Sequence, residues 1–98
     1  MNSDLAEILL NNLLVNAIKH NVPNGEIIIN LSATQLQIAN TAQKILDSNK
    51  IFTRFYKAEQ SAQSNGLGLS IAKQICDAAG YGLSYSFNGD YHYFTVRL

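Results

Sequence analysis

Each of two segments with helical spacing is followed by two segments with strand spacing, and this repeated order constrains the fold of the 98-residue chain most strongly. Apolar residues recur at helical intervals over residues 4–20 and again over residues 67–79. Alternating residues predict strands over 26–32 and 35–40, then a final hairpin that turns at Asn88-Gly89. The order helix, hairpin, helix, hairpin predicts a two-layer α+β sandwich, in which helices cover one face of a mixed, mostly antiparallel sheet.

The composition is that of one small globular domain that spans residues 1–98. Hydrophobic residues make up 47% of the chain, so a packed core is expected and disorder is not. Seven basic residues balance seven acidic ones, which gives no reason to expect nucleic acid or an anionic membrane as the main partner. The lone cysteine, Cys76, excludes a disulfide framework, and its place in an apolar helical pattern predicts a core residue rather than a reactive thiol.

The apolar stretches are far shorter than the ~20 residues needed to cross a bilayer, and no signal peptide is visible. We therefore expect a cytoplasmic domain that does not itself insert into a membrane, although a larger parent protein could be anchored in one.

The first predicted helix carries a polar stripe beside a broad apolar face. Asn12, Asn16 and Lys19 fall within an arc of about 60°, and His20 lies beside it. The expected apolar face contains Leu10, Leu13, Leu14, Ala17 and Ile18. Amide oxygens can ligate a hard cation such as Mg²⁺, and a lysine on the same face can reach a phosphate. The competing interpretation is a solvated helix face.

The second predicted helix begins with two glycines that alternate with leucines, Gly66-Leu67-Gly68-Leu69. Glycine allows close approach of an anion to the backbone, and the first N–H groups of a helix are unpaired donors, so this segment is a candidate phosphate cradle. The pattern is weak alone, because a glycine-containing turn into a helix is common. It lacks the lysine of a Walker loop and the third glycine of a dinucleotide fingerprint.

A third segment, residues 51–57, combines three aromatic residues with two cations just before a polar loop. Its functional interpretation is a phosphate contact from Arg54 or Lys57. Its structural interpretation is a short amphipathic helix with an aromatic core face.

Together these three segments resemble the catalytic domains of bacterial sensor histidine kinases. Residues 12–21 resemble their asparagine box, residues 51–57 their phenylalanine box, and residues 66–75 their second glycine box with the helix that follows. The three motifs occur in the family order and cover nearly the whole chain. The resemblance implies the Bergerat ATP-binding fold, which gyrase-type ATPases, heat-shock chaperones and mismatch-repair ATPases share.

The resemblance also implies roles for individual residues. Asn16 would ligate Mg²⁺, Asn12 would lie near the phosphates, and Lys19 and His20 would contact phosphate or ribose. The hydrolytic relatives carry a glutamate, the general base for water, at the position of Asn12. Since an amide cannot act as a base, phosphotransfer to a protein is favoured over ATP hydrolysis.

The first glycine box of the family is altered here. Its aspartate, which would accept from the adenine amino group, corresponds to Asn40, and Ala42 replaces a glycine where adenine packs closely. Asn40 can still accept, although as an uncharged and weaker acceptor. Ser64 replaces the first glycine of the second box.

The resemblance thus predicts a domain that binds Mg-ATP and transfers the γ-phosphoryl group to a histidine on a separate dimerisation domain, which these 98 residues do not include. A response regulator would act downstream, and the chain by itself is expected to be inactive as a kinase. Two alternatives remain: a non-catalytic nucleotide-binding or scaffold module of the same fold, and a related serine kinase of the anti-sigma type.

Overall fold

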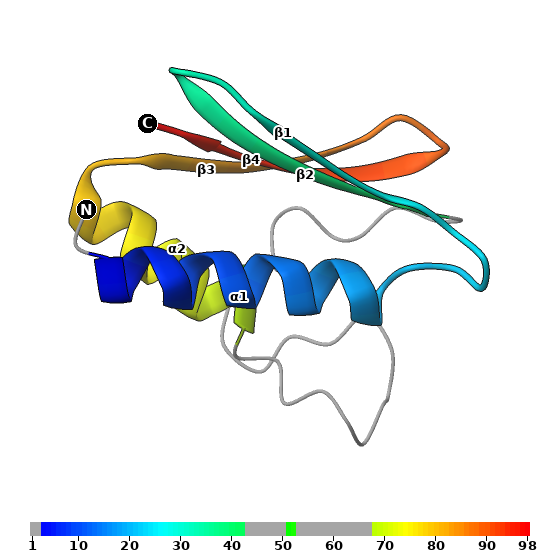
Figure 1. Cartoon of the computed structure of the whole chain (residues 1–98), viewed down its shortest axis with the longest axis horizontal. Helices are drawn as coiled ribbons and strands as arrows, with labels where there is room; N and C mark the ends of the chain where they lie inside the picture. Colours follow the sequence, from blue (N-terminus) through cyan, green and yellow to red (C-terminus); the bar gives the residue numbers. More distant parts are fainter. Residues whose placement is uncertain (1–2, 43–50, 53–67) are drawn as a thin grey trace.

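A computed structural model describes residues 3–42, 51–52 and 68–98 (Figure 1). The elements follow in the order α1 (Ser3–Lys19), β1 (Ile27–Leu31), β2 (Gln35–Thr41), α2 (Gly68–Ala79), β3 (Gly82–Phe87) and β4 (Tyr91–Arg97). Each helix and strand expected within these ranges is present, and its ends lie within one or two residues of the expected ones. In the part of the chain described, no helix has the length and apolarity required to traverse a bilayer.

The four strands form one sheet in the order β1-β2-β4-β3, and every pair of neighbours among them is antiparallel. Both helices lie on the same face of this sheet, and α1 and α2 pack against each other (Figure 1). The expected two-layer α+β sandwich is therefore confirmed. The first hairpin pairs with the second through β2 and β4, so the middle of the sheet joins segments that lie far apart in the sequence.

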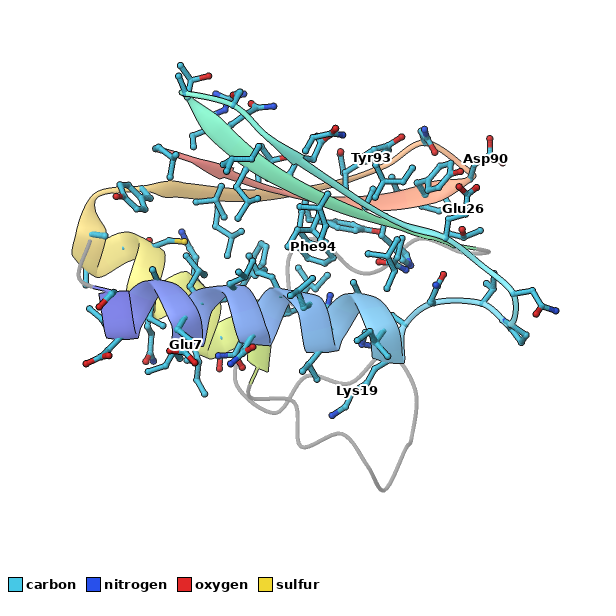
Figure 2. The ribbon with its side chains drawn as sticks, viewed as in Figure 1. Glu7, Lys19, Glu26, Asp90, Tyr93 and Phe94 are labelled. Atoms are coloured by element: carbon cyan, nitrogen blue, oxygen red, sulfur yellow. The ribbon has the colours of Figure 1, made fainter. Side chains whose placement is uncertain are left out.

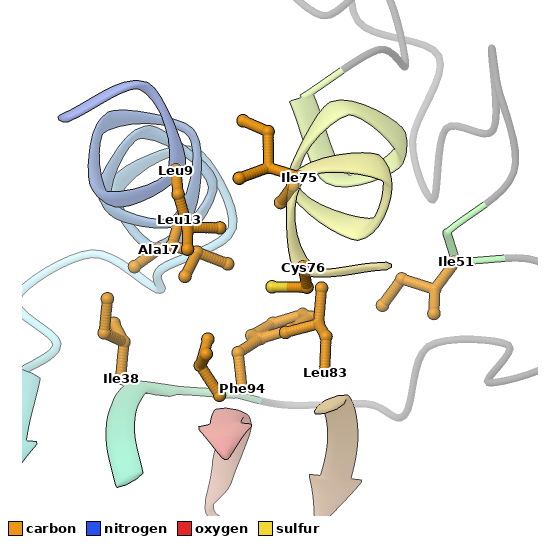
Figure 3. Close-up of a cluster of buried hydrophobic side chains, with 11 residues drawn as sticks. Leu9, Leu13, Ala17, Ile38, Ile51, Ile75, Cys76, Leu83 and Phe94 are labelled. Atoms are coloured by element: carbon orange, nitrogen blue, oxygen red, sulfur yellow. The ribbon is translucent and has the colours of Figure 1, made fainter. Parts of the chain in front are cut away.

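The core fills the layer between the helices and the sheet (Figure 3). Phe94, Ile38 and Leu13 are each 1% exposed, and Cys76 is fully buried, as its helical position predicted. The cluster consists of Leu9, Leu13, Ala17, Ile38, Ile51, Ala72, Ile75, Cys76, Leu83, Phe94 and Val96. It draws on both helices, on strands β2 to β4 and on Ile51, so these elements form one packed unit.

The buried face of α1 is narrower than the sequence predicted. Leu9, Leu13 and Ala17 are buried, whereas Leu10 is 39% exposed and Ile18 is 65% exposed. Residues four apart form a single line along a helix, and this line lies over the sheet. Leu10 and Ile18 lie to the side of that line, which explains why they were wrongly expected to share the buried face.

The strand β1 lies at the free edge of the sheet, and all five of its residues are exposed. Its side chains on the helix-facing side include Ile29, which is opposite the buried Ile38 yet 52% exposed. The two helices therefore cover β2, β4 and β3 and leave β1 uncovered.

Glycine ends the second helix as expected. Gly80 has φ of +76°, and the amide of Tyr81 donates to the carbonyl of Cys76 at 2.8 Å, which closes the last turn. The final hairpin turns at Gly89, where φ is +96°, and Asn88 Oδ1 accepts hydrogen bonds from the amides of Asp90 and Tyr91.

Candidate functional site

Three of the polar residues singled out by the sequence, Asn16, His20 and Asn40, lie at one end of the layer between the helices and the sheet. There the end of α1 is hydrogen-bonded to the end of β2, which pairs with the beginning of β4, and the first residue of α2 lies beside Asn12 of α1. Figure 2 shows Phe94 of β4 pointing into this layer, whereas its neighbour Tyr93 points to the opposite face of the sheet. The inward positions of β2 and β4 therefore decide which side chains line this end.

Asn16 is buried at this end, with 8% of its surface exposed, although it lies on the predicted polar stripe. Its amide nitrogen Nδ2 is buried and has no hydrogen-bond partner in the described structure. An unpaired buried donor lowers stability by an amount comparable to a lost hydrogen bond. Asn16 is thus held in a position that the fold alone does not satisfy, which is common at ligand-binding sites.

Asn12 lies one turn earlier on α1 and faces the start of α2. Its Nδ2 donates to the carbonyl of Ile8 at 2.9 Å, so its oxygen points outward from the helix. A Cβ added to Gly68 would lie 3.4 Å from Asn12 Oδ1. The structure therefore places the asparagine-rich helix directly against the beginning of the glycine-leucine helix, although 55 residues separate the two segments in sequence (68 − 12 − 1).

Asn40 occupies the last inward position of β2 and is fully buried. Its Nδ2 donates to the carbonyl of His20 at 3.3 Å and to that of Thr41 at 3.1 Å. Both neighbours of the amide nitrogen are acceptors, so the orientation of the amide is fixed. Its oxygen Oδ1 is buried and lacks a partner in the described part of the chain, and it can accept a hydrogen bond from a ligand donor.

The end of α1 connects the backbone of Asn16 to the side-chain amide of Asn40. The amide N–H of His20 donates to the carbonyl of Asn16 at 3.0 Å, and the carbonyl of His20 accepts from Asn40 Nδ2. One half-buried residue, His20, therefore ties the side chain of Asn40 to the end of the helix that carries Asn16.

The remaining predicted residues divide into three groups. Lys19 is exposed and, in Figure 2, projects from the side of α1 that faces away from the sheet. Ala42 is buried next to β2, and its amide donates to the carbonyl of Asp90 at 2.8 Å; Leu69 is partly buried and packs against the core. Arg54, Lys57, Gly66 and Leu67 lie outside the described residues, as does Ser64.

The beginning of the aromatic segment packs against the core. Ile51 is 2% exposed, and the ring of Phe52 meets that of Phe94 edge-on, with ring centroids 6.3 Å apart. These two residues agree with the expected aromatic core face. Phosphate contacts from the later residues of the segment stay predictions.

Sequence reasoning missed His92 as a member of this site. His92 is 4% exposed and pairs with Asn40 across β2 and β4. The Tyr85 hydroxyl lies 2.8 Å from its Nδ1. Burial, and to a smaller extent the charge of His20, lower the pKa of His92 below its usual value. The available signal was the alternation of β4, which places His92 on the same face as Phe94 and Val96.

The candidate protein ligands for a metal ion at this end are amide oxygens. Among the described residues, no three histidine, cysteine, aspartate or glutamate side chains come together as a possible metal site. Mg²⁺ accepts amide oxygens and commonly retains several water and phosphate ligands. In Asn16 the oxygen Oδ1 is a ligand of the kind that Mg²⁺ accepts, whereas the unpartnered nitrogen Nδ2 can only donate, for example to a phosphate oxygen.

Comparison with known protein families shows to which family the chain belongs. A family described as "Histidine kinase-, DNA gyrase B-, and HSP90-like ATPase" matches residues 1–98. The chain belongs to this family. The resemblance drawn from the three motifs is confirmed, and the site described above lies in an ATP-binding domain.

Similar proteins place the domain on the histidine kinase side of this family. It is 37% identical to the probable sensor protein PcoS of Escherichia coli over 98% of the chain, and 32% identical to the sensor histidine kinase HprS of Escherichia coli K12 over 96%. It covers 23% and 22% of these two proteins, so it spans about a quarter of the length of its curated relatives or less.

Solved structures agree on the fold. The mycobacterial sensor histidine kinase MprB superimposes with a TM-score of 0.79 at 22% identity, over 99% of this chain and 74% of that one. The nucleotide-free catalytic domain of histidine kinase ThkA gives the same TM-score at 25% identity, over 97% of this chain and 66% of that one. The chain is thus a histidine kinase-type ATP-binding catalytic domain, and the expected α+β fold is that of its relatives.

Proposed function

We propose that this domain binds ATP with Mg²⁺ held by Asn16, and that it passes the γ-phosphoryl group to a histidine on a dimerisation domain of the same parent protein. A response regulator would then receive the phosphoryl group. The proposal places the domain in the cytoplasm, as part of a larger and possibly membrane-anchored sensor.

The observation that supports this proposal is a pair of buried amides, each with one unpartnered polar atom, at the same end of the fold. Asn40 offers the acceptor Oδ1 and Asn16 the donor Nδ2, and His20 links the backbone of Asn16 to the side chain of Asn40. A nucleotide has a base with an amino donor at one end and metal-bound phosphates at the other. The oxygen of Asn40 matches the amino donor of the base, and at the other end Nδ2 of Asn16 can donate to a phosphate oxygen while its Oδ1 is available as a metal ligand.

The chemistry asked of the protein is mainly positioning. Mg²⁺ would neutralise charge on the phosphates and orient the transferred group. The N–H groups at the start of α2, next to Asn12, are suited to phosphate oxygens, and Lys19 and His20 lie at the end of α1 where they can reach phosphate or ribose. Arg54 and Lys57 remain candidates for the same contacts.

Asn12 supports phosphotransfer rather than hydrolysis. Its side chain is an amide that donates to Ile8 and cannot take a proton from water at neutral pH. A histidine on the dimerisation domain brings its own nucleophilic nitrogen, so the kinase needs no base of this kind for attack. Slow ATP hydrolysis is therefore expected of the domain alone.

Replacing Asn16 tests the metal assignment. Asn16→Ala should abolish the Mg²⁺-dependent part of ATP binding, measured by titration calorimetry with Mg²⁺ and with EDTA, while circular dichroism shows an intact fold. Asn11→Ala is a matched control, because Asn11 lies on the same helix but is exposed. Equal Mg²⁺-dependent affinity in both variants would remove Asn16 from the site.

Radiolabelled ATP tests the transfer. The domain alone should acquire almost no label, and it should label its native dimerisation domain when the two are mixed. The label should be acid-labile and alkali-stable, as expected of a phosphoramidate. Acid-stable label on a serine of a partner would favour the anti-sigma type, ATP binding without transfer would favour a scaffold module, and rapid phosphate release would contradict the role given to Asn12.

A further inference from the structure

His92 lies next to Asn40 in the candidate site, and neighbouring side chains restrain its imidazole ring. In the antiparallel register of β2 and β4, Asn40 and His92 lie directly opposite each other. Side chains of such a pair leave the same face of the sheet with Cβ atoms about 4.5–5.5 Å apart. The imidazole of His92 therefore adjoins the amide whose Oδ1 is unpartnered in the described structure.

Three aromatic contacts restrain the imidazole ring. The Tyr85 hydroxyl is 2.8 Å from Nδ1, and the rings of Tyr85 and Phe87 each lie 5.6 Å from the His92 ring between centroids. A phenol O–H donates readily to an imidazole nitrogen, which then carries no proton. With Nδ1 as the acceptor, the neutral ring carries its proton on Nε2 and offers a donor there.

We propose that His92 is a base-recognition residue, which donates from Nε2 to the ring nitrogen N1 of adenine while Asn40 accepts from the adjacent amino group. This inference rests on the proposed binding of ATP at Asn40. Tyr85 acts as a positioning residue, because its hydroxyl selects the tautomer and the ring orientation of His92.

An acceptor beside a donor gives the site its selectivity. Adenine presents an amino donor next to the acceptor N1, which complements the oxygen of Asn40 and the N–H of His92. Guanine presents the reverse order, a carbonyl acceptor next to an N–H donor, so both contacts become unfavourable. The neutral amide at position 40 is thereby supplemented by a second group that reads the same edge of the base.

The environment of His92 keeps its ring uncharged, as the proposed donation from Nε2 requires. Burial is the main cause that lowers the pKa of His92, and His20 lowers it further. At neutral pH the ring is uncharged, so it has one donor nitrogen and one acceptor nitrogen rather than two donors.

Binding of 1-deaza-ATP, in which a C–H group replaces N1, tests the inference directly. The wild-type domain should bind 1-deaza-ATP about threefold to tenfold more weakly than ATP, as expected for the loss of one hydrogen bond. His92→Phe should bind the two nucleotides equally. Tyr93→Phe, on the same strand but the opposite face, should keep the wild-type ratio.

Tyr85→Phe provides a second variant that retains the packing of the ring. In ¹⁵N spectra at neutral pH, the wild-type His92 should show the Nε2–H tautomer, and Tyr85→Phe should shift the population toward a mixture while reducing the ratio between the two nucleotides. This spectroscopic change reports the tautomer and would not follow from a purely structural role.

The outcomes separate this inference from the proposal on which it rests. A wild-type domain that binds ATP but does not distinguish 1-deaza-ATP, or a His92→Phe variant that retains the wild-type ratio, overturns the role of His92 alone. Failure of the wild-type domain to bind ATP overturns the proposed function and this inference together.

Discussion

The two ends of the layer between helices and sheet differ in whether their buried side chains carry polar atoms without hydrogen-bond partners. At one end Leu9, Ile75, Leu83 and Val96 are buried against one another and present no polar side-chain atoms. At the other end Asn16, Asn40 and His92 are equally buried, yet two of them carry polar atoms without partners in the described structure. The apolar end gains stability from burial, whereas the polar end lowers it until a ligand supplies the missing contacts. A single fold thus separates the part that stabilises it from the part that we propose binds the nucleotide.

The largest expected effect lies in the apolar cluster. Leu13 is 1% exposed and packs in the middle of this cluster, so Leu13→Ala should lower the free energy of unfolding by about 2–5 kcal/mol. Leu10→Ala is the matched control, because Leu10 is 39% exposed and its truncation should change stability far less. Urea unfolding of both variants measures the difference, and equal losses would show that the buried face of α1 is assigned wrongly.

A smaller effect is expected at Asn40, where a substitution should lower stability but raise ATP affinity. In Asn40→Asp, the two hydrogen bonds donated to His20 and Thr41 are lost and a carboxylate faces both carbonyls, so stability should fall by about 1–3 kcal/mol. ATP affinity should rise by roughly threefold to tenfold, because a charged acceptor forms a stronger bond with the adenine amino group. Calorimetry and urea unfolding test the two parts separately. Unchanged ATP affinity would contradict the assignment of Asn40 to the base.

The pH dependence of stability should report on the polar end. The pKa of His92 is lowered in the folded protein, so the unfolded chain binds more protons as the pH falls below about 6.5, the usual histidine value. Stability should therefore decrease from that pH down to the pKa of the folded state and then level off with respect to this group. His92→Gln should flatten the dependence, and because the charge of His20 acts on His92, the difference between the two proteins reports on this coupled pair. Thermal unfolding between pH 7 and pH 5 measures it, and identical slopes would disprove the account.

The smallest change in stability is expected at Gly68. A methyl group there would make ordinary contact with Asn12 Oδ1 at 3.4 Å, so Gly68→Ala should leave the unfolding free energy within about 0.5 kcal/mol. The methyl group nevertheless occupies space at the start of α2 that the phosphates are proposed to use. ATP affinity or phosphotransfer should fall more than stability does. An exposed substitution on the same helix, Gln74→Ala, serves as the control.

Most of the fold could be predicted from the sequence, because local patterns determine it. The alternation in both hairpins, the glycine at the end of α2 and the Asn88-Gly89 turn each have a local physical cause. The narrow buried face of α1 could not be predicted, because it depends on how α2 packs beside α1. The exposure of β1 has the same origin: its isoleucines alternate as an ordinary strand does, and the position of the helices decides that they stay uncovered.

Only part of the candidate site could be predicted, because local patterns can be seen in the sequence and tertiary packing cannot. Asn12 and Asn16 are close in sequence, so helical geometry alone places them on one side. Contact between Asn12 and Gly68 depends on tertiary packing, and the motifs pointed to it only through the family resemblance. The pairing of His92 with Asn40 requires the register between two strands from different hairpins, which no single pattern in the chain specifies.

The hydrogen bonds made by His20 also limit insertions and deletions between Asn16 and His20. One residue added between Asn16 and His20 would turn the end of α1 by about 100° and advance it by about 1.5 Å. The carbonyl of His20 that accepts from Asn40 would then point elsewhere, and Asn40 would lose its link to the end of α1. Most hydrogen bonds in the turn between β1 and β2 are local, and its one printed long-range bond, from the amide of Leu98 to the carbonyl of Thr34, involves no residue of the candidate site. We therefore expect length variation among relatives to collect at that turn and to spare residues 16–20.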